Sequence, residues 1–295
     1  MDWDKLRVFH IVADVGSFTH AAEVLNLSQS AVSRQISKLE ESLQVALFHR
    51  HARGLKLTEQ GELLLRTAHE VIAKLSMAEA RITENRERPE GPLKITTTVA
   101  FGSVWLTSRI KEFVALYPNV EVSLVLASTE LDLSMREADV AIRMQPPTQP
   151  DLIQLPLMRL HYHLYASSSY IKEMGIPKTG RDLDEHHLVV YGEDAHPPVA
   201  DLNWVLHYES YAITRSPVLQ VNSIYGIFRA VQSGLGIAAL PDYMSRESEN
   251  LVRVLPEIDG PSVDAFFVYP EELRKSKRIN ILRDFLVNKV REEKF

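Results

Sequence analysis

The sequence predicts an α+β protein in which a mainly helical N-terminal part precedes an α/β part of alternating strands and helices. Apolar side chains recur at helical spacing through much of residues 4–83. Short apolar or alternating runs, separated by helical stretches, follow from residue 93 onward. Between the two parts lies ENRERPEGP (84–92), whose charges, prolines and glycine are typical of a linker.

The composition is that of an ordinary globular chain without thiol chemistry. Its 295 residues are 45% apolar and 24% charged, which is enough for more than one domain with its own core. The absence of cysteine excludes disulfides and cysteine catalysis. The N-terminal MDWDKLRVF places aspartates where a secretory signal carries basic residues, and no run approaches the ~18 apolar residues of a membrane span. We therefore expect a cytoplasmic protein with no membrane partner.

The first sixty residues begin with short helices joined by tight turns. A helix is predicted over 4–15, with apolar positions at Leu6, Phe9 and Val12. Gly16 is expected to end it in the left-handed conformation. Thr19 is expected to cap a second helix and Ser28 a third, after a very short connection. Two helices joined so tightly predict a helix-turn-helix.

The third helix has an apolar stripe and, opposite it, an unusual polar face. Projected at about 100° per residue, its stripe consists of Val32, Ile36, Leu39 and Leu43. The remaining face presents Gln29, Ser30, Ser33, Arg34 and Ser37. Short hydroxyls, an amide and a guanidinium can contact phosphates and base edges in the major groove of double-stranded DNA. The alternative is a face that only contacts solvent, for which Glu and Lys are more usual.

A basic hairpin is predicted directly after this helix. Residues 45–50 and 55–57 are expected to form two short strands around a turn at Gly54. Although the net charge is −6, residues 42–58 contain no acidic side chain. Arg50 at the root and Arg53 at the tip are expected to reach the DNA backbone or minor groove. The alternative is an exposed hairpin whose charges serve only solubility.

A long helix is predicted from residue 59, with a heptad seam of apolar residues. The seam consists of Leu64, Ala68, Val71, Leu75, Ala78 and Ile82. Such a seam favours dimerisation, which would hold two DNA-binding units at a fixed separation. The alternative is packing against the helix's own domain. We place the dimerisation helix at 59–88 and a hinge at 89–92.

Several stretches resemble one known family. The run from Leu6 to Gly61, with SFTHAAEVLNLSQSAVSRQISKLE, LFHR and LTEQG, resembles the N-terminal domain of LysR-type transcriptional regulators. YPNVEVSL (117–124), READVAIR (136–143) and AVQSGLGIAALP (230–241) resemble the family's effector domain. The resemblance covers nearly the whole chain.

This resemblance implies both an architecture and a set of partners. It implies a winged helix-turn-helix domain at 1–58 and a periplasmic-binding-protein-like pair of lobes at 93–295, with a small-molecule effector between them. It further implies a homotetramer, a dimer of dimers, bound to an interrupted inverted repeat at a promoter, with RNA polymerase as a further partner. By the same resemblance, the helix-turn-helix spans about 18–37, and DNA contacts are expected at Gln29, Ser30, Ser33, Arg34, Arg50 and Arg53. Ser37 joins this set from its place on the polar face of the third helix.

The second part of the chain supports an α/β fold from its own pattern. Strands are expected at 93–99, 120–126, 139–144, 156–167, 188–191 and 265–269, and helices at 104–116 and 223–233. Strands that cross between two lobes would place lobe I at about 93–162 and 266–295, and lobe II at about 163–265.

Ligands of such sheets gather at the carboxyl ends of strands, where helix N-termini offer N–H groups to anions. That rule nominates Thr97, Thr98, Ala100, Ser128, Thr129, Arg143, Met144, Asn222 and Ser223. Hydroxyls with an arginine suggest an anionic metabolite. The alternative is that these residues only cap helices, and that Arg143 forms a salt bridge.

Neither an enzyme nor a cofactor is expected. No GxSxG, P-loop or dinucleotide fingerprint is present, and the pairs His49/His51, His161/His163 and His186/His187 lack a further ligand at metal-binding spacing. The leading hypothesis is therefore a sequence-specific transcriptional regulator controlled by its effector. The second hypothesis is a small-molecule sensor whose N-terminal domain serves only oligomerisation.

Overall fold

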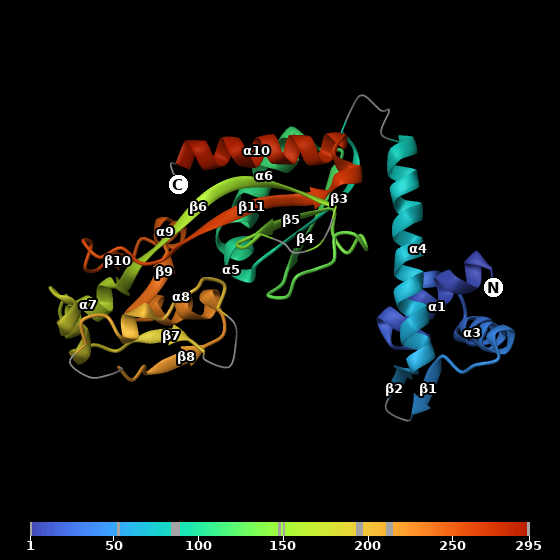
Figure 1. Ribbon diagram of the computed structural model, residues 1–295, viewed down its shortest axis with the longest axis horizontal. Coiled ribbons are helices and arrows are strands. Elements are labelled where there is room, and N and C mark those ends of the chain that lie inside the picture. The colour runs from blue at the N-terminus through green and yellow to red at the C-terminus, as the bar shows by residue number, and fades with distance from the viewer. Residues whose placement is uncertain are drawn as a thin grey trace. The chain divides into compact units, whose positions relative to one another are not determined.

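The computed structural model describes residues 2–51, 54–83, 89–146, 149, 151–192, 197–210 and 215–293. The chain divides into two compact units, Met1–Asn85 and Arg86–Phe295. Figure 1 shows their elements, and each unit is described on its own below.

The N-terminal unit combines short helices, a hairpin and a long helix. Its elements are α1 (Trp3–Val15), α2 (Phe18–Leu25), α3 (Gln29–Leu43), β1 (Phe48–His51), β2 (Gly54–Leu57) and α4 (Glu59–Thr83). β1 and β2 pair as an antiparallel hairpin, which is the predicted wing. This order of elements is the predicted winged helix-turn-helix followed by a long helix.

The helix ends follow local backbone chemistry. Gly16 ends α1 with a left-handed φ of 66°, as predicted. Ser17, and not Thr19, caps α2: its backbone is extended and its hydroxyl accepts a hydrogen bond from the His20 N–H. The expectation for Thr19 was wrong because the helix already begins at Phe18. Ser28 caps α3 as predicted, accepting from the Ala31 N–H at 3.2 Å.

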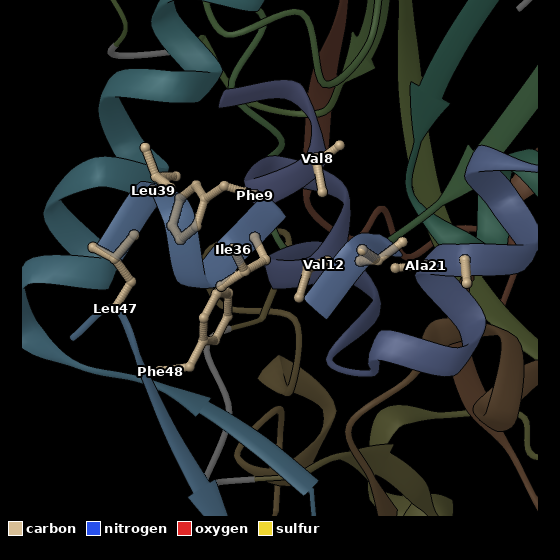
Figure 2. Close-up of a cluster of buried hydrophobic side chains, with 10 residues drawn as sticks. Val8, Phe9, Val12, Ala21, Ile36, Leu39, Leu47 and Phe48 are labelled. Carbon is tan, nitrogen blue, oxygen red and sulfur yellow. The ribbon is translucent and has the colours of Figure 1, made fainter. Parts of the chain in front are cut away.

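A single apolar core holds α1, α2, α3 and the hairpin together. Figure 2 shows Phe9 from α1, Ile36 and Leu39 from α3, and Leu47 and Phe48 at the hairpin converging on one cluster. The ring centroids of Phe9 and Phe48 are 5.4 Å apart. The predicted stripe residues Val32, Ile36 and Leu39 are fully buried in this cluster, and Leu43 packs partly against it.

The junction between α3, the hairpin and α4 is fixed by polar contacts. The Glu40 carboxylate accepts hydrogen bonds from the backbone N–H groups of Leu47 at 2.8 Å and Phe48 at 3.3 Å. Thr58 caps α4 by accepting from the Gly61 N–H, while its hydroxyl donates to the Ala46 carbonyl. Gly61 is needed here, because a Cβ at this position would collide with the Leu47 carbonyl oxygen.

The seam predicted on α4 is divided between the unit's own core and its surface. Ala68 is 0% exposed, and Leu64 packs partly against the core cluster. Ala68 therefore has no surface to offer a partner, and its expected place in a dimer interface was wrong. A heptad pattern records only that one side of a helix is covered, and here α1 covers part of it.

The C-terminal unit is built on a mixed sheet. The described strands of this sheet are β3 (Gly91–Thr97), β4 (Val120–Leu126), β5 (Val140–Arg143), β6 (Leu152–Ser167), β9 (Ala238–Pro241), β10 (Leu251–Arg253) and β11 (Ser262–Pro270). The spatial order is β10-β6-β11-β5-β3-β4, with β9 also paired to β6. β3 runs parallel to β4 and β5, as βα units require.

The long strand β6 belongs to both ends of this sheet. Residues 152–161 pair with β11, whereas residues 162–167 pair with β9 and β10. The two long strands β6 and β11 run side by side across the unit, and helix α10 (Lys277–Glu293) lies along them (Figure 1). They contain the runs 156–167 and 265–269, which the sequence predicted as strands.

Helices cover the end of the sheet formed by β3, β4 and β5. α5 (Val99–Phe101), a π-helical turn (Gly102–Leu106) and α6 (Thr107–Leu116) follow one another without a break. The predicted strand at 93–99 therefore ends earlier, at Thr97, because Val99 already begins a helix. Trp105 donates to the Glu293 carboxylate at 2.7 Å, which joins this segment to the end of α10.

The other end of the unit carries a second, smaller sheet. The elements at this end of the unit include α7 (Ser168–Met174), β7 (Val189–Tyr191), β8 (Leu219–Val221), α8 (Ile224–Gln232) and α9 (Asp242–Arg246). β7 and β8 pair in parallel. The buried Arg215 holds the surrounding loops, with Nε 2.6 Å from Asp184 and hydrogen bonds to the carbonyls of Val205, Tyr208 and Gly180.

In the described parts of the chain, every helix is too short or too polar to cross a bilayer.

We expect Gly61→Ala to loosen the N-terminal unit. The new methyl group would meet the Leu47 carbonyl and lie 2.9 Å from Leu57 Cδ2, so the hairpin must shift. Such overpacking costs about 1–3 kcal/mol, although Ala is otherwise the better helix former. Hydrogen exchange of the full chain should show faster exchange at β1, β2 and the start of α4. Glu62→Ala, at the exposed neighbouring position, is the matched control. Unchanged protection in Gly61→Ala would contradict the role given to this close approach.

Candidate DNA-binding face and ligand pocket

The polar face of α3 is on the surface of the N-terminal unit. Gln29, Ser30, Arg34 and Ser37 are exposed, and Ser33 is half-buried at the edge of the face. The Ser30 hydroxyl lies 3.1 Å from the hydroxyl of the capping residue Ser28. Burial of Val32, Ile36 and Leu39 fixes this orientation, because the two faces of one helix cannot both turn inward.

Arg34 stands out within this face. It is exposed, and within the described parts of the chain its guanidinium makes neither an ion pair nor a hydrogen bond. Lys38 is exposed one turn further along the same helix. A free guanidinium surrounded by short hydroxyls can approach a base edge or a phosphate without first breaking a protein contact.

The wing adds further basic groups to the N-terminal unit. His49 and Lys56 are exposed and lie opposite each other in the β1–β2 pair. Arg50 has its backbone in β1. Its side chain, and the whole of Arg53, lie outside the described residues, so the contacts expected of these two arginines remain predictions.

The rest of the α4 seam can be assigned only in part. Val71 is half-buried, and Leu75 is 43% exposed. Leu63, which the seam did not include, is also an exposed apolar residue. The side chains of Ala78 and Ile82 lie outside the described residues.

A pocket of about 360 Å³ lies in the C-terminal unit, where strand ends and helix starts meet. Six of the predicted ligand positions line it: Thr98, Ala100, Ser128, Met144, Asn222 and Ser223. The remaining wall consists of Val99, Leu160, Tyr162, Tyr191, Pro198, Ile224 and Tyr243. The rule that ligands gather at the carboxyl ends of strands thus brought most of its candidates to one cavity.

The other three candidates lie outside this lining. Thr97 is fully buried and donates to the Ile142 carbonyl at 3.0 Å, inside the sheet. Arg143 is 6% exposed and donates to the Leu131 carbonyl. Burial lowers the pKa of Arg143, against the opposing influence of Glu130. Thr129 is exposed beyond the pocket.

Three tyrosines form a wall that the sequence did not predict. Tyr162 and Tyr243 are buried, as is most of Tyr191. Burial raises the pKa of all three hydroxyls, which keeps them protonated and able to donate. Tyr162 lies in β6, a strand buried along most of its second half, so alternation in the sequence could not mark which side chains face the cavity.

The pocket is lined by the N-terminal end of a helix and by a side-chain hydroxyl that makes no cap hydrogen bond. Ser223 caps α8 and accepts from the Gly226 N–H at 3.2 Å, which places the N-terminal end of α8 at the cavity. Thr98 has an extended backbone ahead of α5 and makes no side-chain cap hydrogen bond. Its hydroxyl is therefore available to a bound molecule.

The described lining contains no lysine, arginine, histidine, aspartate or glutamate. The polar groups that this described lining offers a ligand are hydroxyls, the Asn222 amide and backbone N–H groups, beside apolar side chains. The expected arginine partner of an anion is not among the lining residues.

The predicted histidine pairs have separate surroundings. In the pair His161/His163, His161 is exposed, whereas His163 is buried between Asp242, 2.6 Å from Nδ1, and Asp259, 3.2 Å from Nε2. His186 lies 3.1 Å from the Tyr170 hydroxyl. Both ring nitrogens of His163 and Nδ1 of His186 therefore have partners within the C-terminal unit.

Two family descriptions together match most of the chain. "Bacterial regulatory helix-turn-helix protein, lysR family" matches residues 3–62, and "LysR substrate binding domain" matches residues 86–291. The first covers α1 to the start of α4, including the polar face of α3. The second covers the unit that contains the pocket.

Similar proteins agree with these matches over nearly their full length. The "Uncharacterized HTH-type transcriptional regulator YhjC" of Escherichia coli strain K12 is 30% identical over 97% of both chains. CrgA of Neisseria meningitidis serogroup C is 29% identical over 97% of this chain and 96% of its own. The solved structure of CrgA, a LysR-type transcriptional regulator, aligns with a TM-score of 0.60 at 27% identity, covering 98% and 99% of the two chains.

Proposed function

The chain belongs to the LysR family of bacterial transcriptional regulators, and we propose that α3 reads its DNA operator while the tyrosine-walled pocket holds its effector. The family consists of regulators with a DNA-binding helix-turn-helix domain and an effector-binding domain, and its members are not enzymes. The observation that carries the proposal for DNA is the exposed face of α3, with its free guanidinium at Arg34.

We propose that sequence is read mainly by Arg34 and Gln29, and that Ser30, Ser33 and Ser37 bind phosphates or base edges. Arginine pairs with guanine and glutamine with adenine through two hydrogen bonds each. Serines are short enough to let the helix lie deep in the major groove. Arg50 and Arg53 of the wing would then contact the backbone or the minor groove.

We propose that this regulator assembles as a homotetramer, a dimer of dimers, on an interrupted inverted repeat at a promoter. The exposed apolar Leu75 of α4 supports a helix-mediated dimer, with Ala78 and Ile82 continuing the predicted seam. A dimer with two-fold symmetry presents two recognition helices and so selects two half-sites. Such a regulator acts in the cytoplasm, where promoter and RNA polymerase are accessible to it.

The hypothesis that the N-terminal unit serves only oligomerisation is less well supported. An assembly surface is typically apolar at its centre. The exposed face of α3 instead consists of hydroxyls, an amide and a charged side chain. These groups suit a polar, negatively charged ligand such as DNA.

We propose that the effector is a small metabolite with at most one anionic group, bound between lobe I (about 93–162 and 266–295) and lobe II (about 163–265). Thr98 and Ser128 come from the first lobe, and Tyr191, Asn222 and Ser223 from the second. A ligand that contacts both sides can favour one arrangement of the lobes, and so couple its binding to DNA binding.

The first test is selection of duplexes from a random DNA library by the full-length protein and by Arg34→Ala. We expect the wild type to enrich a two-fold symmetric site. The variant should lose about 1–3 kcal/mol of binding free energy and relax its choice at one base pair in each half-site. Arg7→Ala removes the same charge from α1 and is the matched control, which should select the wild-type sequence. Failure of the wild type to enrich any sequence at moderate salt would contradict the DNA proposal.

The second test uses calorimetry to measure the binding of small monocarboxylic and neutral metabolites to the full-length protein. Thr98→Val removes a hydroxyl that has no cap hydrogen bond but keeps its shape. We expect it to weaken the compound that binds the wild type by about 0.5–1.5 kcal/mol, the net value of one hydrogen bond. Thr129→Val, outside the pocket, should bind like the wild type. Equal affinities in all three proteins would remove Thr98 from the site.

A further inference from the structure

Two histidines and an aspartate from different helices meet in the N-terminal unit. His10 and Asp14 lie one turn apart on α1, and His69 lies on α4. His10 Nε2 is 3.3 Å from Asp14 Oδ2, and His69 Nε2 is 3.4 Å from Asp14 Oδ1. One ligand atom from each of the three residues lies within 4.8 Å of the other two. Among the described residues, no other group of three or more His, Asp or Glu side chains has its ligand atoms this close together.

The separations agree with those around a small metal ion. Zinc binds imidazole nitrogen and carboxylate oxygen at about 2.0–2.2 Å in tetrahedral geometry. Two ligands at that distance and a tetrahedral angle are about 3.3–3.5 Å apart. The two observed nitrogen–oxygen separations fall in this range, but each histidine faces a different oxygen of the Asp14 carboxylate, so at least one side chain must shift for all three ligand atoms to reach one ion.

The surroundings suit metal binding as well. The side chains of His10, His69 and Asp14 are 19%, 32% and 46% exposed, so an ion can enter while the cluster stays partly shielded.

We propose that His10, Asp14 and His69 form a binding site for a divalent transition-metal ion such as Zn²⁺. Two imidazoles and one carboxylate supply the protein ligands, and water completes the coordination. The site is separate from the pocket of the C-terminal unit and from the polar face of α3. It depends on neither the effector nor the operator.

The bound ion would join α1 directly to α4. α1 packs against α2 and α3, so the ion would add a link between the helix-turn-helix and the long helix that follows it. Because the unfolded chain lacks this arrangement, binding would stabilise the folded unit by an amount that grows with the logarithm of the metal concentration above the Kd.

The competing interpretation is a hydrogen-bonded cluster that binds no metal, in which the Asp14 carboxylate is shared by two histidines whose rings meet edge to face, with centroids 4.7 Å apart. Both interpretations predict that the three residues contact each other. They differ in whether Zn²⁺ binds and in which side chains it needs.

The test is calorimetric titration of Zn²⁺ into the full-length chain without an affinity tag, in the wild type, His10→Ala and His69→Ala. We expect one ion per chain in the wild type, and affinity weakened by about ten-fold or more in each variant. The melting temperature of the wild type should rise with Zn²⁺, and that of the variants should not. His20→Ala, which removes an exposed histidine from neighbouring α2, is the matched control and should bind like the wild type.

Substitution of Co²⁺ for Zn²⁺ provides an independent measurement. The wild type should show the visible absorption of Co²⁺ bound by nitrogen and oxygen ligands. Asp14→Asn keeps the shape of the cluster and should diminish both this spectrum and the Zn²⁺ affinity, even if a histidine variant fails to fold. Absence of Zn²⁺ binding in the wild type, or equal affinity in wild type, His10→Ala, His69→Ala and Asp14→Asn, would overturn the proposal.

Discussion

Burial of one apolar stripe on α3 determines what the N-terminal unit presents to its surroundings. Val32, Ile36 and Leu39 are each fully buried against α1 and the hairpin. Each such burial stabilises the fold by about 1.5–3 kcal/mol. Rotating the helix enough to hide Arg34 would expose these side chains and bury an unpaired guanidinium. Burying that charge would cost several kcal/mol more. The exposed polar face is therefore fixed by the core beneath it, and it needs no partner to hold it in place.

In the C-terminal unit, the pocket depends on a strand that connects the two ends of one sheet. β6 pairs with β11 in its first part and with β9 and β10 in its second, so a continuous strand connects the two ends. The pocket lies near this changeover, where Leu160 and Tyr162 of β6 face groups from helix starts on either side. Small bends in one strand can thus alter the spacing of the walls, which is the kind of motion that an effector can bias.

Local periodicity in the sequence predicted most of the helices and strands, but it did not predict which side chains distant in the sequence come into contact. The α3 stripe, the caps at Gly16 and Ser28, and most of the strands follow from spacing within a dozen residues. The strand-end rule brought Thr98, Asn222 and Ser223 to the pocket, because it depends only on topology. It failed for Arg143, whose partner is the Leu131 carbonyl, and the heptad seam failed at Ala68. Both failures concern which neighbour covers a side chain, and a single sequence does not encode that locally. The cluster of His10 with His69 was missed for the same reason.

The described lining of the pocket is uncharged, which bears on the charge of the effector we propose. A carboxylate leaving water loses strong hydration, and without a cationic side chain it recovers only hydrogen bonds and the field of helix N-termini. The end of α8 contributes about 0.3–1 kcal/mol to an anion, and each hydrogen bond about 0.5–1.5 kcal/mol net, or somewhat more to a charged group. Several such terms can balance one negative charge, but a second carboxylate would need a second set of donors. The protonated hydroxyls of Tyr162, Tyr191 and Tyr243 can also donate to neutral oxygens, so the described lining suits a neutral effector as well as a singly charged one.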